Sequence, residues 1–237
     1  MTSHEKLKFP FSLLQKIRPI ENGNASNWTT LFGWYARKGV FPIIRGTLHS
    51  WRFKDVRLPF FLGKNPSISY ARQISLGSGV YLGANITILA FSVSGVHFKD
   101  RVTIRENGWI QCSSSPTFPG EGLNIGAKTY IGPSVTIGVG GPIRIGSGCM
   151  IGAKCTFISE NHATNDDGTP SASSVVRSGI RIGNGCWIGH GVTIVDGVIL
   201  GDGCIVGAGA VVTKSFPTGS RIAGVPAHIL SAGKVGG

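Results

Sequence analysis

The sequence predicts an all-β protein: a parallel β-helix of six-residue repeats, preceded by an N-terminal cap or arm and interrupted by one long loop. Three observations predict this fold. Aliphatic residues recur every six positions, glycine accounts for 36 of the 237 residues, and charged residues make up only 14% of the chain. A periodic aliphatic pattern among glycines is typical of a folded repeat protein, not of a disordered segment.

The repeat unit opens with an aliphatic residue, usually followed by Gly, and has a small or apolar residue at its fifth place. In the C-terminal part the units open without a break at Ile182, Ile188, Ile194, Leu200 and Val206. A period of six fits neither a helix, with 3.6 residues per turn, nor a simple strand, with a period of two. It fits short strands joined by tight corners, three to a coil. Gly or Asn is expected at the corners because both tolerate a positive φ.

The same repeat extends upstream, and it sets the predicted domain limits. Earlier units open at Leu76, Leu82, Ile88, Ile125, Ile131, Ile137, Ile145, Ile151 and Phe157. The pattern blurs between Phe91 and Gly122, and Asn85 is interpreted as a corner residue. We therefore expect a β-helix domain over residues 68–230 and a short tail over 231–237. Residues 1–67 carry no repeat and are predicted to form a basic, aromatic cap or arm with short helices.

The net charge of +12 is concentrated near the N-terminus. Residues 1–72 contain 12 Lys and Arg against Glu5, Glu21 and Asp55, with many aromatic residues between them. This composition is compatible with a peripheral contact with a membrane or a lipid-linked glycan, and it fits a packed cap or a solvated basic surface equally well. No nucleic-acid-binding motif accompanies the charge, so that class of partner is not expected.

The five cysteines form no C-x-x-C pair and are odd in number, so they are interpreted as reduced packing residues. No apolar stretch approaches the roughly 20 residues of a membrane span. Residues 1–20 lack the continuous apolar core of a signal peptide. Together these features predict a cytoplasmic protein, and association with the inner membrane surface remains open.

A long insertion, at about 158–180, interrupts the repeat and carries His162. Acyl transfer to a hydroxyl requires removal of the hydroxyl proton, and an imidazole is suited to that role near neutral pH. From the residues alone, a loop histidine that only bonds the backbone remains an alternative. Glu160, Asp166 or Asp167 are candidates to orient the ring, and the sequence does not choose among them.

The repeat resembles the left-handed parallel β-helix of the hexapeptide-repeat acetyltransferases, which include galactoside, maltose and polysaccharide O-acetyltransferases. In galactoside and maltose acetyltransferases a catalytic His follows a pair of Ile-Gly units. Here Ile145-Gly and Ile151-Gly lead to His162 at the same offset. The resemblance therefore implies that His162 is the catalytic base.

The C-terminal repeats resemble the acetyl-CoA-binding segment of the same family. The matching stretches are residues 206–214 and Ala223-Gly-Val-Pro-Ala. Carried over by position, the cofactor contacts fall on His190, Ala208, Thr213 and Lys214. The step from His190 to Ala208 is one full coil, which would place both residues on one face. The resemblance implies acetyl-CoA as co-substrate, no metal, and a homotrimer with sites between subunits.

These features together predict an acetyl-CoA-dependent O-acetyltransferase that acts on a sugar hydroxyl, in surface polysaccharide biosynthesis. The acceptor-binding Asn and Asp of the galactoside enzymes fall on Gly132 and Gly140, so a simple β-galactoside is not the expected acceptor. N-acetylation of an amino sugar or of a small xenobiotic molecule remains an alternative. A non-catalytic scaffold ranks lower, as does a zinc carbonic anhydrase, which needs three converging histidines.

Overall fold

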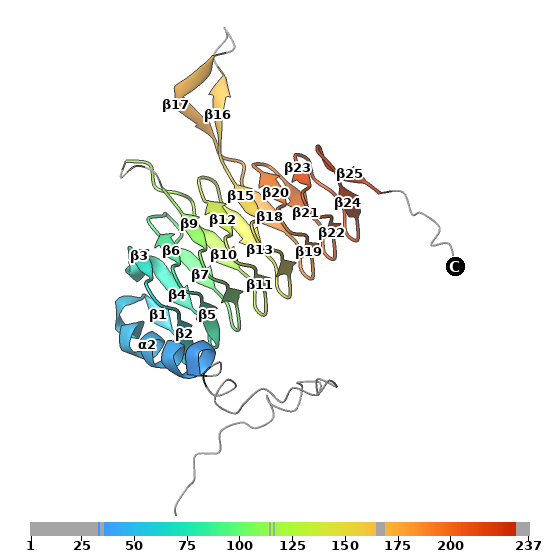
Figure 1. Cartoon of the computed structure of the whole chain (residues 1–237). Coiled ribbons are helices and arrows are strands. Elements are labelled where there is room, and N and C mark those ends of the chain that lie inside the picture. The colour runs from blue at the N-terminus through green and yellow to red at the C-terminus, as the bar shows by residue number, and fades with distance from the viewer. Residues whose placement is uncertain (1–32, 34–35, 114, 116, 165–168, 231–237) are drawn as a thin grey trace, which may run out of the picture.

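The structure is a computed structural model, and it describes residues 33, 36–113, 115, 117–164 and 169–230. Its main body is a triangular β-helix in which three parallel sheets form the three sides (Figure 1). The predicted parallel β-helix is therefore confirmed. About half of the predicted N-terminal arm (residues 1–32 and 34–35) and the predicted tail over 231–237 lie outside the described residues.

Each coil contributes one short strand to each sheet, so the strands of one sheet recur in every third place along the chain. The first sheet, called sheet A here, contains β1 (Asp55–Val56), β4 (Ile74–Leu76), β7 (Val96–Phe98), β10 (Leu123–Ile125), β13 (Ile143–Ile145), β18 (Ile180–Ile182) and β21 (Ile199–Leu200).

Sheet B begins one corner later in each coil. It contains β2 (Phe60–Leu62), β5 (Val80–Leu82), β8 (Thr103–Ile104), β11 (Tyr130–Ile131), β14 (Met150–Ile151), β19 (Trp187–Ile188), β22 (Ile205–Val206), β24 (Arg221–Ala223) and β25 (His228–Ile229). The last pair, β24 and β25, is antiparallel and ends the coil stack.

Sheet C completes each coil. It contains β3 (Ser67–Ser69), β6 (Thr87–Leu89), β9 (Trp109–Gln111), β12 (Thr136–Gly138), β15 (Thr156–Ile158), β20 (Thr193–Val195) and β23 (Val211–Val212).

The aliphatic residues of the repeat point inward and stack from coil to coil. Phe157 of β15 lies between Ile137 and Ile194 in sheet C, and all three side chains are fully buried. This stacking explains how a chain with so little charge is stabilised, because apolar burial is the main favourable term in folding. Cys149, Cys155, Cys186 and Cys204 occupy small inward positions as free, buried thiols, as predicted, and Cys112 is also buried.

Corner residues adopt the left-handed conformation that the repeat requires. Asn85 has φ of +54°. Its side-chain amide donates to Asn107 at 3.1 Å and accepts from Asn65 at 3.3 Å, so three successive corners are linked. The interpretation of Asn85 as a corner residue is confirmed.

The coil stack starts earlier than the sequence pattern suggests. β1 and β2 already pair in parallel with β4 and β5, so the boundary placed at residue 67 falls inside the first coil. The segment Leu58-Pro-Phe-Phe is unlike the other repeat units and obscured these strands, although Leu62-Gly63 is an aliphatic–Gly pair. Before them lie a π-helical turn (Ala36–Val40), the helix α2 (Phe41–His49) and a 3₁₀ turn (Ser50–Arg52). Another 3₁₀ turn, Ala71–Gln73, precedes β4.

Helix α2 covers the open N-terminal end of the stack. Gly46 rests against the backbone carbonyl of Phe60, where a side chain would not fit. Arg45 donates to the carbonyl oxygen of Leu62 at 2.7 Å, which satisfies an acceptor on the free edge of β2. Within the described part of the chain, no helix is long and apolar enough to span a membrane.

Candidate active site

The predicted insertion is a β-hairpin that leaves the coil at the corner between sheets C and A. β16 (Asn161–Thr164) and β17 (Pro170–Val176) pair in antiparallel fashion and project away from the β-helix (Figure 1). His162 lies on β16 opposite Val175, near the base of the hairpin, and its side chain is exposed. The chain therefore presents this imidazole outside the rigid coil, on a projecting element.

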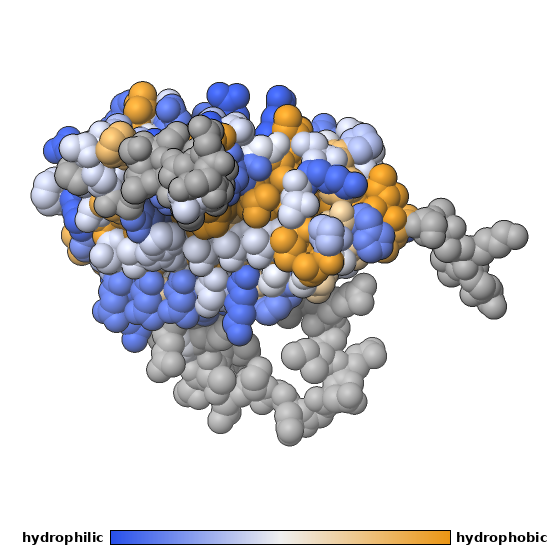
Figure 2. Space-filling model, turned by 90° about the horizontal axis from the view of Figure 1, so that it is seen from above, coloured by the Kyte–Doolittle hydropathy of each residue, from blue (hydrophilic) through white to orange (hydrophobic). Residues whose placement is uncertain are grey.

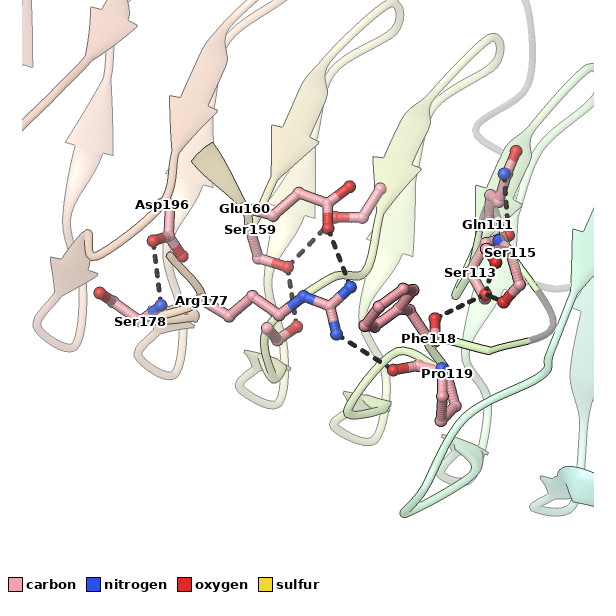
Figure 3. A network of polar contacts seen from close by, with 12 residues as sticks. Gln111, Ser113, Ser115, Phe118, Pro119, Ser159, Glu160, Arg177, Ser178 and Asp196 are labelled. Carbon is pink, nitrogen blue, oxygen red and sulfur yellow. Dashed lines mark hydrogen bonds and ion pairs between the residues drawn. The ribbon is translucent and has the colours of Figure 1, made fainter. Parts of the chain in front are cut away.

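An ion pair joins the two ends of the hairpin. Glu160 immediately precedes β16 and Arg177 immediately follows β17, and Arg177 Nη2 lies 3.4 Å from Glu160 Oε2 (Figure 3). Arg177 Nη1 also donates to the carbonyl oxygen of Pro119 at 3.2 Å. Arg177 thus links the two ends of the hairpin to each other, and it links them to a second loop at the same corner.

The exit and return of the chain are fixed by further polar contacts. Ser159 is buried, and its hydroxyl donates to the carbonyl oxygen of Gly141 at 2.7 Å. On the return side, Asp196 accepts hydrogen bonds from the backbone N–H groups of Ser178 (2.9 Å) and Gly179 (2.6 Å). These contacts tie the hairpin to the coils before and after it, so its base is held at both ends (Figure 3).

A surface cavity of about 210 Å³ lies at the base of the hairpin. We call it the hairpin-base cavity; it is lined by Trp109, Gln111, Cys112, Ser113, Gly138, Val139, Gly140, Ile158, Glu160 and Arg177. A side chain at position 140 would collide with Glu160, so the absence of one leaves room for this carboxylate. The cavity therefore combines an aromatic wall, amide and hydroxyl groups and one ion pair, which suits a polar ligand of the size of a sugar ring.

The residues predicted to bind coenzyme A occupy the last coils. His190 and Ala208 lie in the corners between sheets B and C of adjacent coils, and Gly209 N–H donates to the carbonyl oxygen of His190 at 2.8 Å. The structure therefore brings His190 and Ala208 together on one face. Thr213 and Lys214 follow β23 and are exposed, and Lys214 Nζ lies 5.8 Å from the centre of the Phe216 ring.

Within one chain, the structure separates His162 from the pair His190 and Ala208. The strands of sheet C run from the corner that holds His190 to the corner from which the hairpin leaves, since β15 and β20 are parallel neighbours. His162 and His190 therefore lie at opposite edges of sheet C. A single chain does not assemble all the predicted site residues in one place.

Sequence reasoning missed three features of this region. The blurred repeat after Phe91 hides a second loop, between β9 and β10, whose Pro119 carbonyl anchors Arg177. Sequence reasoning also missed Arg177 itself. Of the carboxylates considered as partners of His162, Glu160 pairs with Arg177, and Asp166 and Asp167 lie outside the described residues.

The third missed feature is a pair of arginines on the outer face of sheet A. Arg144 and Arg181 occupy neighbouring register positions on β13 and β18, and both are exposed. Neither has an ion pair or a side-chain hydrogen bond in the described part of the chain. Their stacking could not be read from the sequence, because the hairpin lies between them.

The ionisable groups fit a structural role for the Cys112 thiol and for the half-buried carboxylate of Glu106. Burial raises the pKa of the Cys112 thiol to about 12, which makes it unreactive at neutral pH. Burial also disfavours ionisation of Glu106, but hydrogen bonds from Arg105 and Lys38 outweigh it and lower the pKa of Glu106 to about 2. Among the described residues, no group of three His, Cys, Asp or Glu side chains is placed to hold a metal ion.

Comparisons with known proteins agree with this architecture. Residues 179–214 match the family model for the bacterial transferase hexapeptide (six repeats), and residues 142–159 match the model for the hexapeptide repeat of succinyl-transferase. A comparison with curated protein sequences gives no match.

Several solved structures are similar. A mutant of AntD, an N-acyltransferase from Bacillus cereus in complex with dTDP and coenzyme A, has a TM-score of 0.53 at 18% identity, over 80% of this chain and 90% of that one. The polysialic acid O-acetyltransferase OatWY has a TM-score of 0.48 at 24% identity, over 74% and 87% of the two chains. A hexapeptide-repeat acetyltransferase from Vibrio cholerae O1 biovar eltor in complex with acetyl-CoA has a TM-score of 0.44 at 18% identity, over 92% and 96%. Two segments of the chain thus match hexapeptide-repeat models, and the chain folds as a left-handed parallel β-helix.

Proposed function

We propose that this protein is an acetyl-CoA-dependent O-acetyltransferase that acts on a sugar hydroxyl, with His162 as general base. One observation carries the proposal: the hexapeptide-repeat coil is interrupted by an anchored hairpin that presents an exposed imidazole. The hexapeptide matches support the transferase class. AntD, which shares the fold, is an acyltransferase crystallised with coenzyme A.

In the proposed reaction His162 accepts the proton of the acceptor hydroxyl as its oxygen attacks the thioester carbonyl. The C–O bond forms and the carbonyl becomes a tetrahedral oxyanion. When the oxyanion collapses, the C–S bond breaks and the thiolate of coenzyme A leaves. The imidazolium returns its proton to that sulfur, so the products are an O-acetyl ester and free coenzyme A.

The proposed site is shared between neighbouring copies of the chain. His162 lies at one edge of sheet C, and His190 with Ala208 lies at the other, so a coenzyme held at the second edge would meet a hairpin only from another copy. Cyclic symmetry provides such an arrangement, because every interface then pairs one edge with the other. A homotrimer, as the resemblance implies, satisfies this requirement.

The acceptor that we favour is an acidic glycan. Arg144 and Arg181 stack on adjacent strands, about 5 Å apart along the ladder. Two such cations repel each other unless an anion lies between or above them, and guanidinium groups bind carboxylates well. They line a cavity of about 480 Å³ on sheet A, which also contains Asn124 and Asn184. Asp202, in the same cavity, already accepts a hydrogen bond from the backbone of Asn184.

A second candidate is N-acylation of an amino sugar, which the similarity to AntD favours. An assay with a panel of acceptors distinguishes O-acetylation from N-acylation. Purified protein is incubated with acetyl-CoA and a panel of neutral, acidic and amino sugars and oligosaccharides, while free thiol is measured and products are analysed by mass spectrometry. O-acetyl esters are cleaved by mild base and amides are not. Absence of thiol release with every acceptor, together with no acetyl-CoA binding by calorimetry, would remove the proposed function.

The acidic-acceptor proposal has its own readout. Arg144→Gln with Arg181→Gln should raise KM about 10- to 100-fold for a carboxylate-bearing acceptor and leave KM for acetyl-CoA unchanged. A matched control, Lys128→Gln, removes an exposed charge that lies outside the cavity on sheet A and outside the hairpin-base cavity. Equal KM values for the variant and the wild type would contradict this choice of acceptor.

We place the reaction in the cytoplasm, which fits five reduced cysteines.

A further inference from the structure

The N-terminal helix carries its large apolar side chains on the side that faces away from the protein. Pro42 and Gly46 form the buried side, where α2 rests on β2. The opposite side holds Phe41 (57% exposed), Ile44 (50%), Leu48 (66%) and, in the following turn, Trp51 (72%). We call these four residues the α2 stripe.

The α2 stripe is unusual for an exposed surface. Its members recur at intervals of three and four residues, so they line one side of the helical segment. Scattered exposed apolar residues are normal, but a contiguous set of this size marks a surface that another body covers. Figure 2 shows another exposed apolar patch, over the last coils, but that patch lies on a different part of the molecule.

The surroundings of the α2 stripe are basic. Lys54 follows the turn that holds Trp51 and is exposed. A cavity of about 500 Å³ beside the helix is lined by Phe41 together with Arg45 and Lys64. The only carboxylate in that cavity, Glu106, is neutralised by ion pairs with Lys38 and Arg105.

We infer that the α2 stripe binds an anionic lipid surface. Helices that lie in a membrane interface combine Trp, Phe and Leu on one side with Lys and Arg at the border, and neither feature suffices alone. A typical protein partner would instead require acidic groups opposite these cations and a concave match to a convex helix. Among the described residues from Ala36 to Leu62, the only acidic residue is Asp55.

The position of α2 at the end of the β-helix is compatible with this contact. The helix is the outermost layer of the N-terminal end, so its exposed side can meet a flat surface without obstruction by the described coils (Figure 1). The hairpin with His162 projects from a later coil, at a corner of the prism rather than at this end. Membrane contact through α2 therefore leaves the hairpin and the sheet faces accessible to a glycan.

The test is sedimentation of the full-length protein with phosphatidylcholine vesicles that contain or lack phosphatidylglycerol. The wild type should bind only the anionic vesicles. Ile44→Gln with Leu48→Gln should weaken binding about 100-fold, which corresponds to about tenfold for each large apolar side chain. Val93→Gln with Ile229→Gln, two exposed apolar residues elsewhere (69% and 57%), is the matched control and should bind as the wild type does.

A second readout locates the contact. Brominated acyl chains should quench tryptophan fluorescence in the wild type, and Trp51→Phe should remove most of that quenching. The inference is wrong if the wild type does not bind anionic vesicles, or if the stripe variant binds them as well as the wild type does. It is also wrong if the stripe variant changes the oligomeric state in light scattering and leaves vesicle binding intact, because the stripe is then a contact between copies.

Discussion

Arg177 offers the sharpest test of how the hairpin is positioned. Replacement with Met keeps most of the side-chain volume and removes the guanidinium, which bonds Pro119 and pairs with Glu160. The expected result is a loss of about 100-fold in kcat with little change in stability, because displacement of a catalytic group by about 1 Å has an effect of that size.

The small effect on stability follows from the contacts. A hydrogen bond from a charged donor to Pro119 contributes about 1.5–3 kcal/mol. The ion pair with Glu160, whose side chain is 40% exposed, contributes at most about 1 kcal/mol. Against these, Arg177 Nε is buried and has no hydrogen-bond partner among the described residues, and removing it recovers about 1–3 kcal/mol. The terms nearly cancel, so the free energy of unfolding should change by no more than about 1–2 kcal/mol.

The assay combines steady-state kinetics with acetyl-CoA and thermal unfolding of the same preparations. Arg101→Met is the control, since Arg101 is exposed and lines neither the hairpin-base cavity nor the cavity on sheet A. Unchanged kcat in Arg177→Met would refute the positioning role. A loss of activity accompanied by a loss of several kcal/mol in stability would refute it too, because the residue would then hold the fold and not the hairpin.

Three further predictions concern the scaffold. Phe157→Ala removes a fully buried ring from the sheet C ladder and should lower the free energy of unfolding by about 3–5 kcal/mol, measured by urea denaturation. Gly140→Ala places a methyl group where Glu160 lies, so it should displace this carboxylate and, with it, the base of the hairpin. As for Arg177, such a displacement should lower kcat, here by at least about tenfold, without a matching loss in melting temperature. Glu106→Gln should destabilise the protein by about 1–3 kcal/mol at neutral pH. Because the pKa of Glu106 falls from 4.5 to about 2 on folding, its contribution is complete above pH 4.5 and is lost as the pH falls toward 2. The difference between the wild type and Glu106→Gln should therefore vanish in that range, and a constant difference down to pH 2 would contradict the ion-pair argument.

The fold was predictable because one periodic pattern determines it. Every aliphatic residue that opens a C-terminal unit, from Ile182 to Val206, is buried in the structure, since a six-residue step returns each side chain to the inside of the prism. The first coil was predictable in principle but was overlooked. Its strand β2 ends with Leu62-Gly63, an aliphatic–Gly pair six residues before Ile68, but the preceding Pro59-Phe-Phe is unlike the other repeat units.

The site was predictable only in part. The insertion and its histidine stand out because they interrupt the repeat. The hairpin-base contacts did not, because Arg177, Pro119 and Glu160 are far apart in the sequence and meet only when the corners stack. The sequence also did not reveal which side of α2 faces the coil. Its amphipathic pattern suggests that the apolar side packs inward, but Gly46 permits the closer approach to β2, and the large side chains are left outside.

The most direct test of the account asks whether His162 of one copy works with Ala208 of another. His162→Ala and Ala208→Trp are each expected to be nearly inactive, one without a base and the other with an obstructed coenzyme site. Co-expressed in equal amounts and purified as mixed oligomers, they should recover about one quarter of wild-type activity, because about one interface in four joins two intact halves. A mixture no more active than the better single variant would show that both halves belong to one chain, and the shared site would be wrong.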